Sequence, residues 1–177
     1  MEEGNGSGEN IFYTFPTENF PLEFQIVESW PDVPPYFPPT KNITFSQFYS
    51  NPSELYSSIE ILLVPSLWEE GVPCVISEAL FNKIPVIAHD IGGIKEAGSE
   101  YILYVNPPTI QGHFLKETII YPQIESAEET RVAKDFCEKI LWIDTHPQEK
   151  QRLADGGYDF TKSLENNARK EILRIFN

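Results

Sequence analysis

Two glutamates that flank the start of a predicted helix are the residues of this chain best suited to binding a hydroxylated ligand. Glu70 lies just before Pro73, where the helix is expected to begin, and Glu78 lies five residues inside it. At about 1.5 Å of rise per residue, Glu78 is about 7–8 Å along the helix axis from Pro73. Carboxylates accept hydrogen bonds from vicinal hydroxyls. The pair therefore suits a ligand with a sugar at one end and a ribose at the other.

The backbone between the two glutamates predicts an anion site. Amides in the first turn of a helix have no partner within the helix, and they favour a negative group such as phosphate. Pro73 has no amide hydrogen, so Gly71, Val72 and Cys74 are the expected donors. Gly71 also permits close approach of a ligand to the backbone. The Cys74 side chain is expected to be small and buried rather than a reactive thiol.

The alternative interpretation is that both glutamates are solvated acids that bind nothing. An isolated pair of glutamates is more often of this kind. Glu78, however, lies between Ile76 and Leu80 on a mostly apolar helix. That placement makes the two interpretations about equally strong for Glu78.

Short apolar segments around the two glutamates predict a parallel α/β sheet. They are rich in Ile, Val, Phe and Tyr, and several are apolar throughout, which is typical of strands buried on both faces. These segments lie at 11–15, 24–27, 43–45, 61–64, 85–88 and 102–105. Helices are expected between the later ones, at 51–59 and 73–82. The alternation implies right-handed crossovers and a doubly wound sheet, which places the loop after 61–64 at the ligand-binding edge.

The last third of the chain is expected to be helical. Ser126 and Glu129 have the spacing of a capping box, and apolar residues at helical spacing follow them. A short helix is expected to begin at Pro147 and to stop at Gly156-Gly157. A terminal amphipathic helix is expected from about Thr161 onward. This last helix could cover its own sheet or lie against a partner.

Composition excludes several classes of protein. The chain has 177 residues, a length that suits one domain, and a formal net charge of −14. Such an acidic chain is a poor partner for nucleic acid or an anionic membrane, and no apolar run approaches the length of a membrane span. Residues 1–10 are predicted to be a flexible acidic N-terminus without the features of a secretion signal, and residues 11–177 a single domain.

The cysteines and histidines predict neither a disulfide framework nor a metal site. Two cysteines fit a reducing compartment, so we expect the protein to be cytoplasmic. The three histidines, His89, His113 and His146, lie far apart and lack the spacing of metal ligands. No cofactor or metal is therefore expected.

The order of motifs between residues 63 and 106 resembles one enzyme family. The motifs, in chain order, are Pro65-Ser66, Glu70-Gly71, Glu78-Ala79, Pro85-Val86-Ile87 and Gly92-Gly93-Ile94 with Glu96. Each is weak alone, but this order and spacing resemble the C-terminal, donor-binding half of the family 4 (group 1) glycosyltransferases. These are retaining, metal-independent enzymes of the GT-B fold. The resemblance implies a Rossmann-like domain that binds a nucleoside diphosphate sugar.

The resemblance assigns a role to each matching position. Glu70 matches the glutamate that contacts the donor sugar and the charge that develops near its anomeric carbon, which is the catalytic role. Gly71 and Val72 match the backbone turn that meets the sugar and the diphosphate. Glu78 matches the glutamate that binds the ribose hydroxyls, and Ser66 lies where the pocket wall forms. The Gly92-Gly93 turn is expected to be structural rather than ligand-binding.

The chain also departs from the family. An Arg and a Lys that grip the diphosphate should follow the first strand, but the first Lys here is Lys41 and the first Arg is Arg131. Lys83 and Lys95 are the candidates that could replace them in part. A chain of this length also has no room for the N-terminal domain that holds the acceptor. It would then be a fragment, a partner of a separately encoded N-terminal GT-B domain, or a degenerate relative.

Two functions remain open from the sequence. The first is the donor-binding half of a retaining enzyme that transfers a hexose from a nucleoside diphosphate sugar to an acceptor. The second is a non-catalytic, degenerate GT-B-like module for binding or interaction. A third and weaker interpretation is another GT-B-like enzyme such as a sugar-nucleotide epimerase, which the Glu-Gly segment fits less well.

Overall fold

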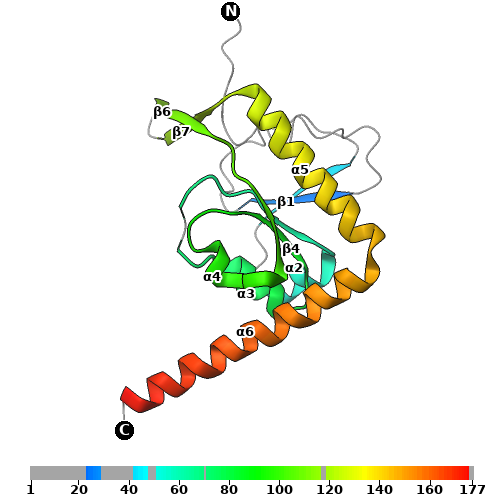
Figure 1. Cartoon of the computed structure of the whole chain (residues 1–177), viewed down its shortest axis with the longest axis vertical. Coiled ribbons are helices and arrows are strands. Elements are labelled where there is room, and N and C mark those ends of the chain that lie inside the picture. The colour runs from blue at the N-terminus through cyan, green and yellow to red at the C-terminus, as the bar shows by residue number, and fades with distance from the viewer. Residues whose placement is uncertain (1–22, 29–41, 48–50, 70, 117–118, 176–177) are drawn as a thin grey trace, which may run out of the picture. The chain divides into compact units, whose positions relative to one another are not determined.

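The structure is a computed structural model that describes residues 23–28, 42–47, 51–69, 71–116 and 119–175 (Figure 1). The chain forms two compact units, each described separately below. One contains residues 1–55 and 108–137, and the other contains residues 56–107 and 138–177. The strand expected at 11–15, the N-terminal segment 1–10 and Glu70 lie outside the described residues. The expectation of one domain over 11–177 stays a prediction.

A three-stranded parallel sheet is the centre of the second unit. Its strands are β3 (Leu62–Val64), β4 (Val86–His89) and β5 (Ile102–Val105), in the order β3-β4-β5. All four residues of β4 are buried, as its run of apolar residues predicts for a central strand. The connections carry α3 (Cys74–Phe81), α4 (Ile94–Gly98) and the 3-10 turn η1 (Ser99–Tyr101). The predicted parallel α/β, Rossmann-like architecture with helices at the C-terminus is confirmed.

The C-terminal helix α6 (Pro147–Ile175) runs without a break through the two glycines that were expected to end it. It packs on α3, α4 and η1 (Figure 1). A Cβ atom at Gly156 would lie 2.2 Å from Cε1 of Tyr101, and one at Gly157 would lie 2.6 Å from Cδ2 of Leu80. The prediction of two separate helices is therefore wrong. These glycines permit close packing of α6 on its neighbours, and that packing outweighs their poor helix propensity.

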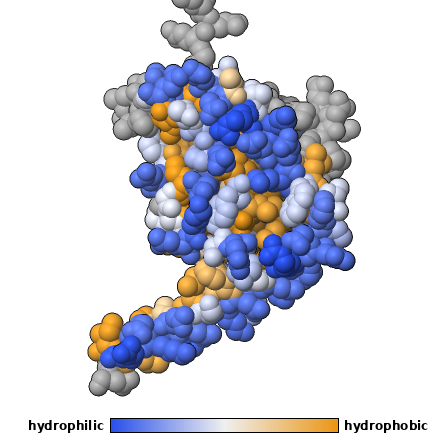
Figure 2. Space-filling model, viewed as in Figure 1, coloured by the Kyte–Doolittle hydropathy of each residue, from blue (hydrophilic) through white to orange (hydrophobic). Residues whose placement is uncertain are grey.

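The second half of α6 does not cover the sheet of its own unit. Leu153, Ala154 and Gly157 in the first half are buried. By contrast, the described residues of the predicted C-terminal stripe, Leu164, Ala168 and Ile172, are exposed, and so are Leu173 and Ile175. Phe176, the last residue of that stripe, lies outside the described residues. Figure 2 shows apolar surface near the C-terminal end of this helix. The first half of α6 therefore packs on the helices of its own unit, and contact of the second half with a partner stays a prediction.

The first unit contains two separate strand pairs. β1 (Phe24–Glu28) and β2 (Ile43–Gln47) pair in parallel, with Phe24 opposite Ile43. β6 (Ile110–Lys116) and β7 (Ile119–Ile124) form an antiparallel hairpin that the sequence analysis missed. Helix α2 (Pro52–Ser58) begins in this unit, and its residues from Tyr56 onward belong to the second unit. The Asn51 side chain accepts a hydrogen bond from the Ser53 amide, at the predicted start of the helix. Asn51 is thus its N-terminal cap.

Helix α5 (Ser126–Thr145) begins one residue earlier than the expected capping box allows. The amides of Glu128 and Glu129 both donate to the carbonyl of Glu125. Ser126 is therefore the first helical residue rather than the cap, and its carbonyl accepts a hydrogen bond from the Thr130 hydroxyl. The capping-box prediction is wrong at this position.

No helix in the described part of the chain is long and apolar enough to span a membrane.

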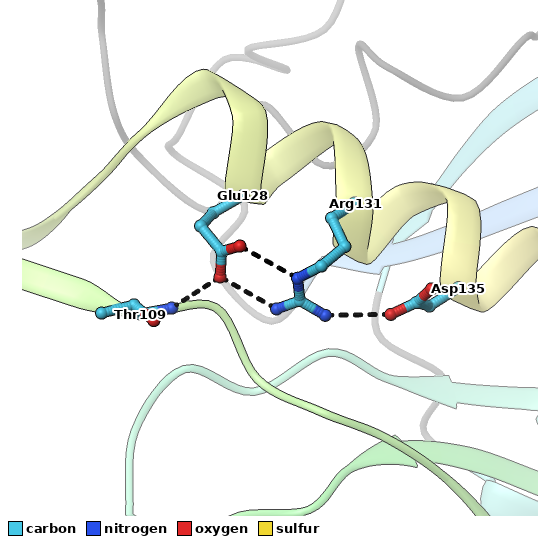
Figure 3. A network of polar contacts seen from close by, with 4 residues as sticks. All are labelled: Thr109, Glu128, Arg131 and Asp135. Atoms are coloured by element: carbon cyan, nitrogen blue, oxygen red, sulfur yellow. Dashed lines mark hydrogen bonds and ion pairs between the residues drawn. The ribbon is translucent and has the colours of Figure 1, made fainter.

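A polar network fixes the start of α5 to the chain just before β6 (Figure 3). The Glu128 carboxylate accepts a hydrogen bond from the Thr109 amide at 3.1 Å and two from the Arg131 guanidinium at 3.0 Å. Arg131 also donates to Asp135 at 2.9 Å. The Arg131 hydrogen bonds, followed by that from Thr109, lower the pKa of Glu128 to about 2.

We expect Glu128→Gln to destabilise the protein at neutral pH but not in strong acid. Because the folded-state pKa of Glu128 is depressed, its contribution is present above the ordinary value of 4.5 and disappears as the pH falls toward about 2. Urea unfolding at pH 7, 4 and 2.5 measures the difference between variant and parent. A difference that is the same at all three pH values would contradict this role. Asp144→Asn, which neutralises another exposed carboxylate on the same helix, is the control.

Candidate functional site

The loop between β3 and α3 lies at the carboxyl edge of the three-stranded sheet. It carries Ser66, Gly71 and Val72, and the last two are exposed. Pro73 precedes α3 with an extended backbone (φ −66°, ψ 119°), and no side chain caps the helix. The first turn of α3 therefore follows an exposed segment of the loop. An anion site formed by first-turn amides requires such an exposed segment.

The Glu78 carboxylate is exposed on α3 and is held by a buried tyrosine. The hydroxyl of Tyr56, on α2, donates to Oε2 of Glu78 at 2.8 Å and lies 3.4 Å from the carbonyl of Val75. Burial, followed by the hydrogen bond to Glu78, raises the pKa of Tyr56 well above its usual value. The Tyr56 hydroxyl therefore keeps its proton and donates a hydrogen bond to the Glu78 carboxylate. Tyr56 could not be predicted from the sequence, because nothing in its local pattern points to a partner 22 residues away.

A buried histidine joins the ends of two neighbouring strands. His89, the last residue of β4, is fully buried, and its Nδ1 lies 2.8 Å from the carbonyl oxygen of Ser66. Because a carbonyl can only accept, Nδ1 carries the hydrogen and donates it. The bond fixes the position of the β3–α3 loop at Ser66. This role of His89 has no signal in the sequence, where the histidine spacing argues only against a metal site.

The Gly92-Gly93 turn after β4 packs directly on the β3–α3 loop. A Cβ atom at Gly93 would lie 2.2 Å from the carbonyl oxygen of Gly71 and 3.3 Å from the amide nitrogen of Val72. Gly92 has a φ of 54°, the left-handed region that favours glycine. The turn therefore packs against the backbone of Gly71 and Val72, the two residues that the sequence predicts to contact the ligand.

The two lysines considered for the diphosphate differ in position. Lys95 lies in α4, after the carboxyl end of β4, and forms an ion pair with Asp90 at 2.7 Å. Lys83 follows the C-terminal end of α3, which is the opposite edge of the sheet, and pairs with Asp155 at 2.7 Å. Of the two, only Lys95 therefore lies on the same edge of the sheet as the predicted anion site. Asp90 is its present partner.

The structure brings most of the predicted site residues together in one unit. Ser66, Gly71 and Val72 lie in the β3–α3 loop, and Cys74 and Glu78 lie on α3. Cys74 is exposed, so the expectation of a small buried residue is wrong. Its place at the first position of α3, on the outer side of the helix start, explains the exposure. In the described ranges, no group of three His, Cys, Asp or Glu side chains could hold a metal ion.

Known sequences match this chain over the region that carries these residues. Residues 38–117 match the family model described as "Glycosyl transferases group 1". The chain is also 33% identical over 82 residues to TuaC of Bacillus subtilis strain 168, which is named as a teichuronic acid biosynthesis glycosyltransferase. That match covers 46% of this chain and 20% of TuaC.

Solved structures share the fold at low sequence identity. The chain resembles sucrose-phosphate synthase from Thermosynechococcus elongatus, with 16% identity and a TM-score of 0.62 over 97% of this chain and 43% of that one. It resembles a glycosyltransferase from Rickettsia africae at 18% identity, with a TM-score of 0.61 over 95% and 45% of the two chains. Anabaena HepE in complex with UDP gives 16% identity and a TM-score of 0.55 over 75% and 32%.

The chain spans about a fifth of TuaC and less than half of each of these solved proteins. The matched sequence segment includes β3, α3, β4 and β5, and thus the loop that His89 and Gly93 support and the helix that Tyr56 contacts. The fold, the matched segment and the relative agree with one another. Residues 38–117 are therefore similar to the group 1 glycosyltransferases, and this segment carries the described residues of the candidate site.

Proposed function

We propose that the β3–α3 edge binds a nucleoside diphosphate sugar and that the chain is the donor-binding part of a retaining, metal-independent hexosyltransferase. The observation that carries the proposal is the uncapped start of α3, with the Glu78 carboxylate fixed on the same helix. HepE, which shares the fold, has been solved with UDP and with UDP-glucose. Those complexes support the choice of ligand class.

Each site residue has a role in this proposal. The amides of Val72 and Cys74 bind the diphosphate at the start of α3, where the helix dipole favours negative charge. Glu78 accepts hydrogen bonds from the ribose hydroxyls. Glu70 contacts the hexose, and Ser66 forms part of the pocket wall. No metal takes part in this scheme, because the amides and the helix dipole carry the phosphate charge.

Transfer also needs a domain that binds the acceptor and brings it to the anomeric carbon. We propose that such an N-terminal GT-B domain, on the same or another polypeptide, completes the site and works with this chain in the cytoplasm. The exposed apolar side chains of α6 from Leu164 to Ile175 supply a surface for that contact. A nucleic-acid partner is not part of the proposal, since the net charge is −14.

Calorimetric titration of the chain with UDP, GDP, ADP and their hexose conjugates tests the proposed ligand. We expect micromolar binding of one nucleotide, and Glu78→Ala should weaken it about tenfold or more, because bonds to an ionised group are each worth about 1.5–3 kcal/mol. Glu165→Ala removes the same charge from an exposed position on α6 and should leave the affinity unchanged. Equal affinity of Glu78→Ala and the parent would contradict the assignment of Glu78.

The second candidate function is a non-catalytic module that keeps the fold. It is favoured by the ion pairs of Lys95 with Asp90 and of Lys83 with Asp155, which neutralise both lysines considered for the diphosphate. A chain that binds none of the nucleotides would make this the leading function. Measurable binding of a nucleoside diphosphate sugar would favour the transferase instead.

A further inference from the structure

Tyr56 of α2 and Glu78 of α3 form a hydrogen-bonded pair in which the tyrosine is buried and the glutamate is exposed. The tyrosine is 4% exposed and belongs to the core, whereas the glutamate is exposed. Their hydrogen bond of 2.8 Å therefore runs from a fixed donor to a carboxylate that would otherwise be mobile. Within the described residues, Tyr56 is the one side chain that hydrogen-bonds this carboxylate. An unrestrained glutamate side chain has several accessible rotamers, and ordering it opposes binding.

We infer that Tyr56 is a positioning residue, whose hydroxyl holds the Glu78 carboxylate ready to accept the ribose hydroxyls of the nucleotide. This inference rests on the proposed function, because it concerns the same site. The Tyr56 bond engages Oε2, so Oε1 keeps its full capacity to accept from a ligand. Tyr56 itself does not touch the ligand. It acts only through Glu78, by reducing the entropy that Glu78 loses on binding.

The hydroxyl of Tyr56 has no comparable role in the core. A phenylalanine would fill the same volume and bury the same ring, so packing alone does not require the oxygen. The second acceptor, the Val75 carbonyl at 3.4 Å, is at the limit of a hydrogen bond. Burial and the bond to Glu78 raise the pKa of Tyr56, so its hydroxyl stays protonated at neutral pH. The position of Glu78 should therefore not vary with pH through this residue.

The test uses calorimetry of the full chain with the tightest binder among UDP, GDP and ADP, and with the 2′,3′-dideoxy analogue of that nucleotide. The variants are Tyr56→Phe, Glu78→Gln and the double variant. The matched control is Tyr104→Phe, which removes another tyrosine hydroxyl of the same unit, one that donates to the Ser99 carbonyl. Thermal unfolding of each variant confirms that it is folded.

We expect Tyr56→Phe to weaken binding of the nucleotide about three- to tenfold and to leave binding of the dideoxy analogue unchanged. The double variant should bind no more weakly than Glu78→Gln, because Tyr56 acts through that carboxylate. Tyr104→Phe should bind both ligands like the parent.

Other outcomes overturn the inference in distinguishable ways. If Tyr56→Phe weakens both ligands equally, its role is general and structural. If Glu78→Gln weakens binding but Tyr56→Phe does not, the proposed function stands and the positioning role is wrong. If the parent chain binds none of the three nucleotides, the proposed function fails and this inference fails with it.

Discussion

Gly93→Ala is expected to weaken nucleotide binding about tenfold or more and to lower the free energy of unfolding by about 1–3 kcal/mol. The new Cβ atom would lie 2.2 Å from the Gly71 carbonyl oxygen and 2.7 Å from its carbon. Both are backbone atoms, which cannot turn aside as the end of a side chain can. The β3–α3 loop would have to move, and with it the amides that we assign to the diphosphate.

The effect of Gly93→Ala is steric rather than conformational, since Gly93 has a φ of −82° and a ψ of 11° that alanine adopts readily. Gly112→Ala is the matched control, because its Cβ would meet only the Oε1 atom of the Gln123 side chain, at 3.2 Å. Calorimetry and urea unfolding measure both variants. Binding and stability of Gly93→Ala equal to those of the parent would show that the loop is not held by this contact.

Glu70→Gln is expected to reduce the rate of hexose transfer about 100-fold or more in the complete enzyme. The neutral amide would no longer stabilise the positive charge that develops near the anomeric carbon, and loss of one such group costs about 100- to 1000-fold. Nucleotide affinity should change little, because the diphosphate and ribose contacts remain. Glu70 lies outside the described residues, so this prediction rests on its place between Ser66 and Gly71 in the sequence motif.

Initial rates of transfer, measured with the chain joined to an acceptor-binding domain, check this prediction. Glu69→Gln is the matched control, because it makes the same change at the adjacent residue. A Glu70→Gln enzyme with the parental rate would remove Glu70 from the catalytic machinery. Equal loss in both variants would point to a charge effect of the loop rather than to one residue.

Local patterns predicted the elements that carry the site. The expected strands at 61–64, 85–88 and 102–105 and the helix at 73–82 match β3, β4, β5 and α3 to within one residue at each end. Each is a short apolar run or an amphipathic turn bounded by a proline or a polar residue. Such elements depend mainly on their own residues and on burial in a sheet.

Features that depend on distant contacts were not predicted. Gly156-Gly157 resembles a helix end until the structure shows Tyr101 and Leu80 against the two glycines. The support of Glu78 by Tyr56 and of Ser66 by His89 likewise joins residues more than 20 positions apart. The β6–β7 hairpin was missed because β7 contains Pro122, a residue that argues against a strand unless it lies at an edge.

A backbone amide spectrum of the isotope-labelled chain, recorded during titration with UDP, GDP or ADP, shows directly whether the start of α3 binds a nucleoside diphosphate. We expect saturable shifts concentrated at the amides of Gly71, Val72, Cys74 and Val75, with those of Tyr56 and Glu78 also affected. The amide signals of β6 and β7 should not shift. Saturable shifts located elsewhere, or no shifts with any of the three nucleotides, would show that the start of α3 is not the nucleotide site.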